Sequence, residues 1–346
     1  MIVEQSRTRQ RKKRSKRKIL KSILTLFVLT FVVIGGAIFY SAWKINSTIT
    51  GAAEPELERG VKSEMRTEAV NPSKDNFSVL LLGDDSRPGE TRARTDAMLV
   101  ATFNKDEKSI ILTSIPRDSR VEMVGLGFMD KINHANSRGG LNMTINTVEN
   151  FLDIPIDYYG YVRFEGLVDV VDALGGIEVD VPFDFTFNEK STDSYNLQFT
   201  EGLQHINGKE ALAYSRMRKQ DPLGDIGRGQ RQQQVIEGII KQAASFSTIT
   251  NFNGLMDAIG DNLGTNFSFA NLVALHSYAG SLTDIENHQV QGSNATINGV
   301  YYLEVDQEHL ADLQTRLKQH LEIDGHSLND PNPFEEEKFE EIETSY

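Results

Sequence analysis

The stretch Val79-Leu-Leu-Leu-Gly-Asp-Asp-Ser-Arg87 opens the segment that decides the fold, which runs on to Thr113-Ser-Ile-Pro-Arg-Asp118. This segment contains three short runs rich in β-branched and aliphatic residues, at 77–82, 98–103 and 109–115. Runs of this length and composition predict β-strands. A charged turn at 105–108 joins the second and third runs, so we expect them to form a hairpin beside the first strand.

Acidic and basic side chains gather where these predicted strands begin or end. They are Asp84, Asp85, Arg87, Arg94, Asp96, Arg117 and Asp118. Loops at the end of a rigid sheet often carry function. Carboxylates hold hard cations, and arginines form paired hydrogen bonds with phosphate oxygens. The pattern therefore predicts a site for a cation together with a polyanion.

Composition excludes several classes of chemistry. The chain has 346 residues, of which 39% are hydrophobic, which is enough for one large domain with appendages. It has no cysteine, which removes disulfides, thiolate metal sites and cysteine nucleophiles. It also lacks a Gly-x-Ser-x-Gly or His-Glu-x-x-His motif and any histidine cluster, so serine and zinc hydrolases have no motif to support them.

The first 43 residues have the charge pattern of a membrane anchor. Residues 1–21 hold ten Lys and Arg with one acid, and residues 22–43 carry no charge and are rich in Leu, Val, Ile and Phe. About 20 apolar residues cross a bilayer as a helix, and flanking positive charge stays in the cytoplasm. We therefore expect a single-pass protein of the cell membrane, with a cytoplasmic N-terminus and an extracellular body.

The rest of the chain divides by composition. We expect an extracellular spacer at 44–75, one catalytic domain at 76–322 and an acidic, disordered tail at 323–346. Because the body is strongly acidic, general binding of nucleic acid is disfavoured. A cytoplasmic DNA-binding regulator is a weak alternative, because it would require the acidic body to lie inside the cell.

Two apolar helices are expected after the central segment. Their stripes recur at helical spacing over 141–152 and 164–174, and an alternating strand follows at 177–181. We interpret both stripes as core that packs against the sheet, with a lipid-binding groove between the helices as the alternative. The polar and aromatic segment 183–200 is predicted to be a loop near the site.

A second group of arginines lies in the following segment. Arg216, Arg218, Arg228 and Arg231 fall within sixteen positions, and a helix is predicted from Arg228 with Gln232 one turn later. The N-terminus of such a helix attracts anions. Isolated arginines usually serve solubility, and ion-pair networks give similar patterns. We favour an anion site because these arginines abut an apolar helix.

Several motifs, in this order, together resemble the LytR-CpsA-Psr family. They are Leu80-Leu-Leu-Gly-Asp-Asp-Ser-Arg87, Arg94-Thr-Asp96, Ser114-Ile-Pro-Arg-Asp118, Lys131-Ile-Asn-His134, Thr147-Val-Glu-Asn150, Asp172-Ala-Leu-Gly-Gly176, Tyr214-Ser-Arg-Met-Arg218 and Gly227-Arg-Gly-Gln-Arg-Gln-Gln-Gln234. The resemblance is dense over 77–242. It implies an α/β fold, a three-layer α/β/α sandwich with a central mixed sheet, whose interior accepts a polyprenyl chain.

The resemblance also implies an activity. Family members are magnesium-dependent phosphotransferases that move an anionic glycopolymer, such as teichoic acid or capsular polysaccharide, from an undecaprenyl-pyrophosphate carrier to peptidoglycan. The alternative from another class is a non-catalytic receptor that binds a lipid-linked glycan and regulates the envelope. Asp118, Asp84 and a metal-bound group all remain candidates for the general base.

Site residues follow from the family motifs. The resemblance implies Mg²⁺ at Asp85 and Asp96, although the chain has Asp84-Asp85 where the family usually has one acid. It assigns the catalytic phosphate contacts to Arg117, Arg216, Arg218, Arg228 and Gln232. Further substrate contacts are expected at Arg87, Arg94, Lys131, Arg231, Val148, Leu152, Phe164, Leu167 and Val171. We expect His134 to be a hydrogen-bonded structural residue.

Overall fold

The computed structural model describes residues 57, 60, 62–84, 94–188, 196–245, 263–268, 271 and 284–334, without the side chains of 84, 244, 245 and 263. All of them belong to the compact unit Thr48–Tyr346. The predicted membrane segment, Asp85 and Arg87 lie outside these ranges. Within the ranges, every helix is too short or too polar to cross a membrane.

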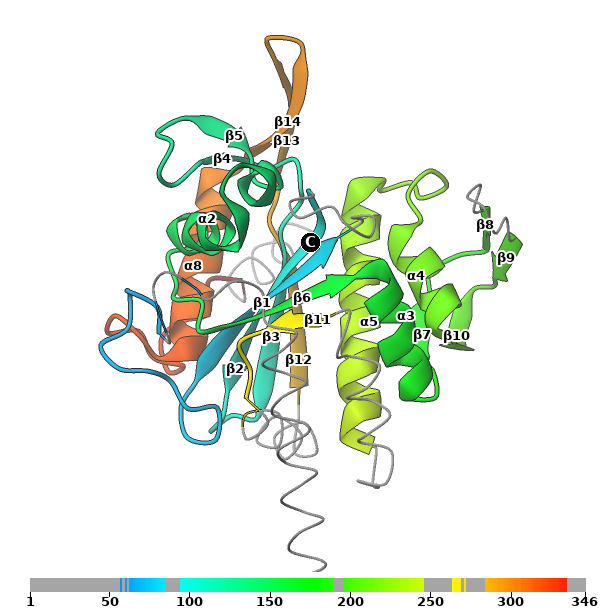
Figure 1. The fold of residues 1–346 in the computed structure, drawn as a ribbon, viewed down its shortest axis with the longest axis horizontal. Coiled ribbons are helices and arrows are strands. Elements are labelled where there is room, and N and C mark those ends of the chain that lie inside the picture. Colours follow the sequence, from blue (N-terminus) through cyan, green and yellow to red (C-terminus); the bar gives the residue numbers. More distant parts are fainter. Residues whose placement is uncertain are drawn as a thin grey trace, which may run out of the picture. The chain divides into compact units, whose positions relative to one another are not determined.

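A six-stranded mixed sheet forms the centre of the domain (Figure 1). Its strands, in spatial order, are β11 (Leu263–Thr265), β6 (Tyr158–Arg163), β1 (Phe77–Asp84), β2 (Thr95–Asn104), β3 (Ser109–Ser114) and β12 (Asp284–Gln289). β2 pairs antiparallel with both β1 and β3, which confirms the predicted hairpin and its neighbour. β6 pairs parallel with β1, and β12 pairs parallel with β3.

Strand direction determines which residues share an edge of the sheet. β1, β3, β6 and β12 all run the same way, because β2 reverses direction between β1 and β3. Their carboxyl ends, together with the start of β2, therefore lie along one edge. The loops that leave this edge carry the predicted acids and arginines.

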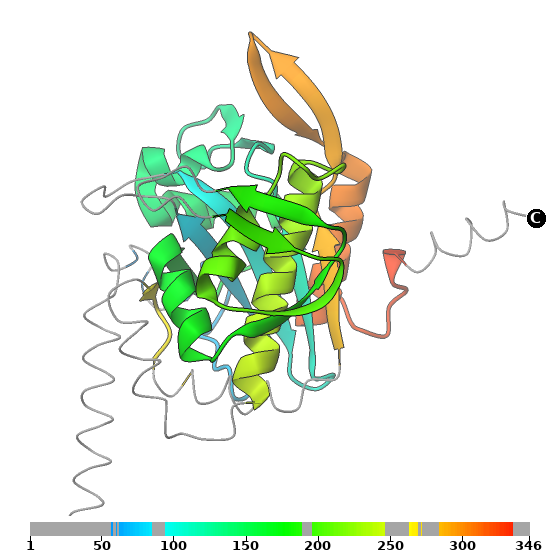
Figure 2. The same cartoon turned by 90° about the vertical axis from the view of Figure 1, so that its right-hand side faces the viewer.

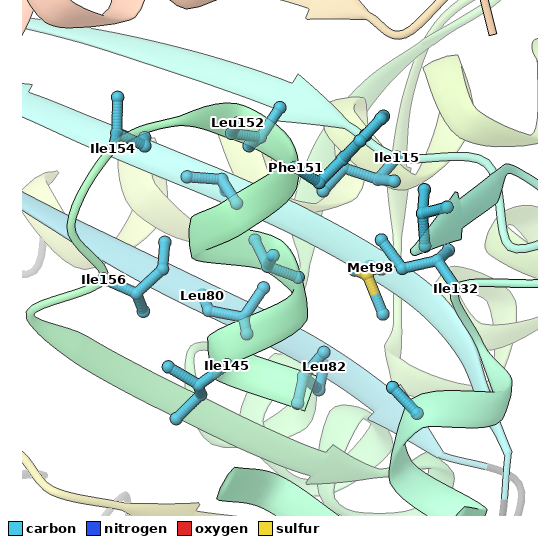
Figure 3. Packing of buried hydrophobic residues seen from close by; sticks show 14 of the residues in the cluster. Leu80, Leu82, Met98, Ile115, Ile132, Ile145, Phe151, Leu152, Ile154 and Ile156 are labelled. Atoms are coloured by element: carbon cyan, nitrogen blue, oxygen red, sulfur yellow. The ribbon is translucent and has the colours of Figure 1, made fainter. Parts of the chain in front are cut away.

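One face of the sheet is covered by α2 (His134–Leu152) and α8 (Gln307–Leu321). Leu80 and Leu82 of β1 and Met98 of β2 point into the same cluster as Ile145 and Leu152 of α2 (Figure 3). Because side chains alternate along a strand, the residues between these point to the opposite face. The predicted apolar stripe of α2 is thus ordinary sheet-packing core.

The opposite face carries α5 (Asp225–Ser245), whose Ile236 and Ile240 pack beside Val79 of β1 and Leu112 of β3. A further layer packs on α5 and contains α3 (Phe164–Ala173), β7 (Ile177–Val181), β10 (Gly202–Ile206) and α4 (Gly208–Arg216) (Figure 2). The hairpin of β8 (Phe185–Asn188) and β9 (Asn196–Phe199) joins it through stacked Phe185 and Phe199. The segment expected to be a loop at 183–200 therefore contains two strands.

The positions of α2 and α3 overturn one expectation. α2 belongs to the cluster on one face of the sheet, and α3 to the layer on the other (Figure 1). This arrangement contradicts the alternative interpretation of the two stripes, a lipid groove between these helices, and agrees with the favoured one, core that packs against neighbouring elements. The physical reason is that β6 lies between them in sequence, so the chain passes through the sheet before α3 begins.

Two small ribbons and the C-terminal segment complete the described domain. β4 (Arg120–Glu122) pairs with β5 (Met129–Lys131), and β13 (Gly292–Ile297) pairs with β14 (Val300–Val305). After α8, Phe334 packs against the core cluster, and Gln319 Nε2 donates to the Pro331 carbonyl at 2.9 Å. Residues 323–334, which were expected to begin a disordered tail, thus contact the domain in this structure, and residues 335–346 lie outside the described ranges.

Candidate functional site

A pocket of about 1200 Å³ opens at the carboxyl edge of the sheet. Its walls come from the end of β3, the start of α5, the end of β12, the β13–β14 hairpin and the start of α8. Its charged lining includes Asp96, Arg117, Asp118, Arg218, Asp225, Arg228 and Glu304. Residues that are distant in sequence thus meet at the edge where the sequence predicts a cation and polyanion site.

Asp96 owes its position to an irregularity in β2. The register of β1 against β2 shifts between Gly83 and Asp84, so that Gly83 faces Ala97 and Asp84 faces Thr95. Asp96 is therefore the extra residue of a β-bulge. Bulges redirect side chains and occur often beside active sites. Here the bulge brings the Asp96 carboxylate into the pocket, with its side chain 35% exposed.

Arg117 is held by carboxylates from several elements. Its Nη1 donates to Asp96 Oδ1 at 2.9 Å, and its Nε lies 3.6 Å from Asp118 Oδ2. Burial alone lowers the pKa of Arg117, but the hydrogen bond to Asp96 and the charges of Asp96, Asp118 and Asp225 outweigh it, so the net shift is upward. Among the described residues, its buried Nε has no hydrogen-bond partner. Arg117 is therefore fixed by its carboxylate partners at the pocket lining.

Arg228 brings a second guanidinium to the same place. It lies in the first turns of α5, and its Nη2 is 3.1 Å from Asp225 Oδ1. Burial lowers the pKa of Arg228, and the charges of Arg117 and Arg218 lower it further, against opposition from Asp225 and Asp96. The guanidinium stays protonated, because its ordinary pKa is far above physiological pH. Arg117, Arg218 and Arg228 line the same pocket, and such a group of guanidinium groups favours binding of a polyanion.

Glycine allows α5 to approach the sheet at this point. An added Cβ at Gly229 would lie 2.9 Å from Ser114 Oγ and 3.0 Å from Gln289 Nε2, closer than real side chains allow. In the next turn of α5, Gln233 bonds the helix to the sheet: its Nε2 donates to the backbone carbonyls of Leu112 in β3 at 3.0 Å and His288 in β12 at 2.6 Å. The N-terminus of α5, with its positive dipole end, is thereby fixed at the pocket wall.

Arg231 does not fit its expected role as a substrate contact. It is only 1% exposed, and its Nε donates to the Tyr214 carbonyl at 3.1 Å. Its two terminal nitrogens bind the Met217 carbonyl and the Asp221 carboxylate. The side chain therefore satisfies carbonyls at the C-terminal end of α4 and neutralises the buried carboxylate of Asp221, while Arg231 itself lies outside the pocket lining. These contacts favour a structural role for Arg231, and its expected role as a substrate contact stays a prediction.

The other predicted polar residues divide between the pocket and its surroundings. Arg218 and Gln232 line the pocket. Arg216 lies outside the lining, with its guanidinium carbon 4.9 Å from the centre of the Phe164 ring. Lys131 Nζ pairs with Asp118 Oδ1 at 2.7 Å behind the pocket wall. Arg94 is exposed, one residue before β2 and outside the lining.

The predicted lipid contacts also divide. Val148 and Leu152 are fully buried in the cluster with α8, so they have no free surface for a ligand in this structure. Val171 is fully buried in the layer that packs on α5. Phe164 and Leu167 are only partly buried on that same side of the sheet. His134 hydrogen-bonds Asp130 Oδ2 at 3.0 Å, as expected of a structural residue.

The sequence motifs do not contain every residue that lines the pocket. Gln289, Tyr301 and His309 all line the pocket but come from a segment without a recognisable motif. Gln289 ends β12, so a polar residue at the end of a strand was the available signal. For Tyr301 no local signal exists, because only the pairing of β13 with β14 places it at the pocket.

A magnesium ion suits the donor chemistry at Asp96. The described residues contain no group of three or more His, Cys, Asp or Glu that could hold a metal. Mg²⁺ in phosphoryl-transfer sites, however, commonly uses one or two carboxylates together with substrate phosphates. Asp96 Oδ1 is engaged by Arg117, and the carboxylate is partly exposed in the pocket. The arrangement thus fits one protein carboxylate facing a phosphate.

Comparison with known proteins identifies the family. The LytR_cpsA_psr family profile matches residues 41–319. The chain belongs to the LytR-CpsA-Psr family. It is 44% identical over 312 residues to a protein of Halalkalibacterium halodurans named polyisoprenyl-teichoic acid–peptidoglycan teichoic acid transferase TagU, an alignment that covers 89% of this chain and 99% of that protein. It is thus a homologue of the TagU transferases.

Two solved structures of TagT share its fold. TagT bound to LIIa-WTA superposes with a TM-score of 0.67 at 36% identity, covering 78% of this chain and all of that chain. TagT with bound octaprenyl pyrophosphate lipid gives a TM-score of 0.62 at 32% identity, with the same coverage. The family resemblance and the mixed α/β fold with flanking helices are therefore confirmed.

Proposed function

We propose that this chain is a membrane-anchored extracellular transferase that attaches teichoic acid, or a related anionic glycopolymer, to peptidoglycan. The donor would be the polymer linked to undecaprenyl pyrophosphate. The observation that carries the proposal is the crowding of Arg117 and Arg228 in one pocket, beside the N-terminus of α5. The proposal is supported by the names of the TagU relatives and of the two TagT complexes.

The reaction requires charge neutralisation more than covalent chemistry by the protein. An acceptor hydroxyl attacks the phosphorus that carries the polymer, the bond to the bridging oxygen breaks, and undecaprenyl phosphate leaves with that oxygen while a proton is released. Negative charge on the pyrophosphate repels the incoming oxygen, and it grows on the leaving phosphate. Hydrogen-bond donors at fixed positions reduce this repulsion and stabilise the charge on the leaving phosphate, because they are oriented before the reaction begins.

Each pocket residue has a proposed part in this reaction. Arg117, Arg218 and Arg228 hold the pyrophosphate oxygens, and the Gln232 amide supplies a further donor. Asp96, with Asp85 as its proposed partner, would hold Mg²⁺, which when bound supplies further charge neutralisation on the phosphate oxygens. Arg216 and Phe164 would contact the carrier where it leaves the pyrophosphate, because their stacked side chains lie outside the pocket lining.

The polyprenyl chain is proposed to lie between the sheet and the helices on the α5 side. Part-buried apolar side chains lie on both sides of α5: Leu81 and Ile236 pack against the sheet cluster, and Leu167 and Ile239 pack against the cluster of α3 and β7. The fully buried stripe of α2 offers no comparable surface. Residues 22–43 are proposed as the anchor that keeps the domain and its lipid-linked donor on one membrane.

A transfer assay with the full-length protein tests the proposal. The protein in liposomes is incubated with undecaprenyl-pyrophosphate-linked teichoic acid, peptidoglycan and Mg²⁺. Covalent attachment of the polymer and equimolar release of undecaprenyl phosphate are expected. Tight binding of the donor with no release of the carrier would refute the transferase and support the receptor. Proteolysis of intact protoplasts tests the topology, since digestion of the domain from outside is expected.

A further inference from the structure

The β13–β14 hairpin forms one wall of the pocket and projects beyond the sheet (Figures 1 and 2). In its register Asn294 faces Leu303, and Thr296 faces Tyr301. Residues directly opposite each other point to the same face of a ribbon, and alternate residues point to the other face. Asn294, Tyr301 and Leu303 therefore share one face, and all three line the pocket.

The root of the hairpin is joined to the segment that carries Arg117. The backbone amide of Leu303 donates to the Asp118 carbonyl at 2.9 Å. Nη1 of Arg120 lies 3.2 Å from Oε1 of Glu304. A ligand that rests on the hairpin is therefore held at a fixed position relative to Arg117, since the hairpin is bonded to the segment 118–120 that follows it.

Tyr301 is a large exposed side chain with a fixed orientation. The residue is 43% exposed, and its hydroxyl donates to Asn294 Oδ1 at 2.8 Å. Lys131 Nζ lies 5.6 Å from the centre of its ring and is itself paired with Asp118. An exposed aromatic ring held at its hydroxyl and near a cation loses little freedom when a ligand packs on it.

Charge differs between this wall and the arginine side of the pocket. Near the hairpin the charged groups are paired, Asp118 with Lys131 and Glu304 with Arg120. On the other side, Arg117, Arg218 and Arg228 share Asp96 and Asp225 as partners, so positive charge is in excess there. The hairpin wall therefore offers an aromatic ring, an amide and neutralised ion pairs, which suit an uncharged, hydroxyl-rich ligand better than a phosphate.

We propose that Asn294 and Tyr301 form the subsite for a sugar of the acceptor glycan. A pyranose has an apolar C–H face that packs on an aromatic ring and hydroxyls that hydrogen-bond amides and carboxylates. The inference rests on the proposed transferase function, which places the lipid-linked pyrophosphate at the arginines. The acceptor then approaches from the hairpin side, with its hydroxyl directed toward Arg117.

Three single variants separate this role from a structural one. Tyr301→Ala removes the ring, and Tyr301→Phe keeps the ring while losing the hydroxyl bond to Asn294. Tyr302→Ala is the matched control, because Tyr302 is the next residue on the same strand and lies on the opposite face, outside the pocket lining. All three change the hairpin, but only the first removes the proposed sugar contact.

The transfer assay in liposomes is then run at varied concentrations of peptidoglycan and of lipid-linked donor. For Tyr301→Ala we expect the acceptor KM to rise about tenfold, in line with the loss of one aromatic contact, with an unchanged donor KM. Tyr302→Ala should keep the wild-type acceptor KM within about twofold, and Tyr301→Phe, which keeps the ring but loses the bond that orients it, should raise it less than Tyr301→Ala does. A wild-type acceptor KM in Tyr301→Ala, or an equal rise for Tyr302→Ala, would overturn the subsite.

Direct binding distinguishes failure of the subsite from failure of the proposed function. A soluble glycan fragment released from peptidoglycan is titrated into the full-length protein in detergent, without donor. Wild-type binding that Tyr301→Ala loses and Tyr302→Ala keeps supports the subsite, even if no transfer occurs. Transfer by the wild type together with unchanged fragment binding in Tyr301→Ala supports the transferase and refutes the subsite.

Discussion

Nη1 of Arg117 donates a 2.9 Å hydrogen bond to Oδ1 of Asp96, and the bulge in β2 is what brings that carboxylate within reach. The bond fixes one terminal nitrogen of the guanidinium and leaves the buried Nε without a hydrogen-bond partner in the described part of the chain. An arginine held in this way keeps both its charge and a fixed direction for its remaining donors. Its function should therefore depend on guanidinium geometry as well as on charge.

Replacing Arg117 by lysine tests this dependence. Lysine retains the positive charge but lacks the planar arrangement of donors, so Arg117→Lys should lower the transfer rate by about 10²-fold or more. Arg138→Lys is the control, because Arg138 pairs with Asp130 and lies outside the pocket lining. Rates are measured with the lipid-linked donor at saturation. Wild-type transfer by Arg117→Lys would mean that only charge matters at this position.

Removing the Asp96 carboxylate tests the proposed metal contact. Asp96→Ala should cost several kcal/mol of transition-state stabilisation, because charge neutralisation by the cation and the orientation of Arg117 are both lost. Since the side chain is 35% exposed, thermal stability should change little. Transfer is measured over a Mg²⁺ series, with Asp106→Ala, an exposed acid in the turn before β3, as control. A folded Asp96→Ala variant with the wild-type rate and Mg²⁺ response would exclude the contact.

Arg228 and Arg231 should respond in opposite ways to substitution. Arg231 forms a buried ion pair with Asp221, and removing one partner of such a pair typically costs about 3–5 kcal/mol. Arg231→Met should therefore lower the free energy of unfolding, measured with urea on the purified protein. Arg228→Lys should leave that free energy nearly unchanged while impairing transfer. If Arg231→Met were as stable as wild type and defective only in transfer, Arg231 would be a substrate contact after all.

These two arginines also show where sequence reasoning stops. Both lie in one motif on one helix, three residues apart, and each carries the same functional group. What separates them is that the C-terminal end of α4 packs over Arg231, a tertiary contact that no local pattern encodes. The β1–β3 strands were predictable because short apolar runs and a charged turn are local features.

Helices α2 and α3 and the β13–β14 hairpin also have positions that local sequence patterns do not predict. The stripes of α2 and α3 predicted helices correctly, but the face of the sheet that each covers depends on the path of β6 between them. Asp96 and Arg117 were recognised from family motifs, whereas Tyr301 was not. Its place at the pocket results from strand pairing and from the bond between Leu303 and Asp118.

Because of His320 on α8, we expect the free energy of unfolding to decrease in mild acid. It is about 1% exposed, and its ring nitrogens lie 2.8 Å from Thr102 Oγ1 and 2.9 Å from Ser109 Oγ. Burial and, to a smaller extent, the charge of Arg316 lower the pKa of His320 to about 3, against opposition from Glu286. The ring is therefore neutral in the folded protein at every pH above this value.

Between about pH 6.5, the ordinary histidine pKa, and pH 3, the unfolded chain binds a proton at this position that the folded protein does not. The free energy of unfolding should therefore be unaffected by His320 above pH 6.5. Below that pH it should fall as the pH is lowered, by up to about 1.4 kcal/mol per pH unit for this group. Urea unfolding between pH 7.5 and 5 measures the slope. The slope should be smaller in His320→Gln and unchanged in His205→Gln, whose histidine is exposed. Equal slopes in His320→Gln and wild type would show that His320 is not the group responsible.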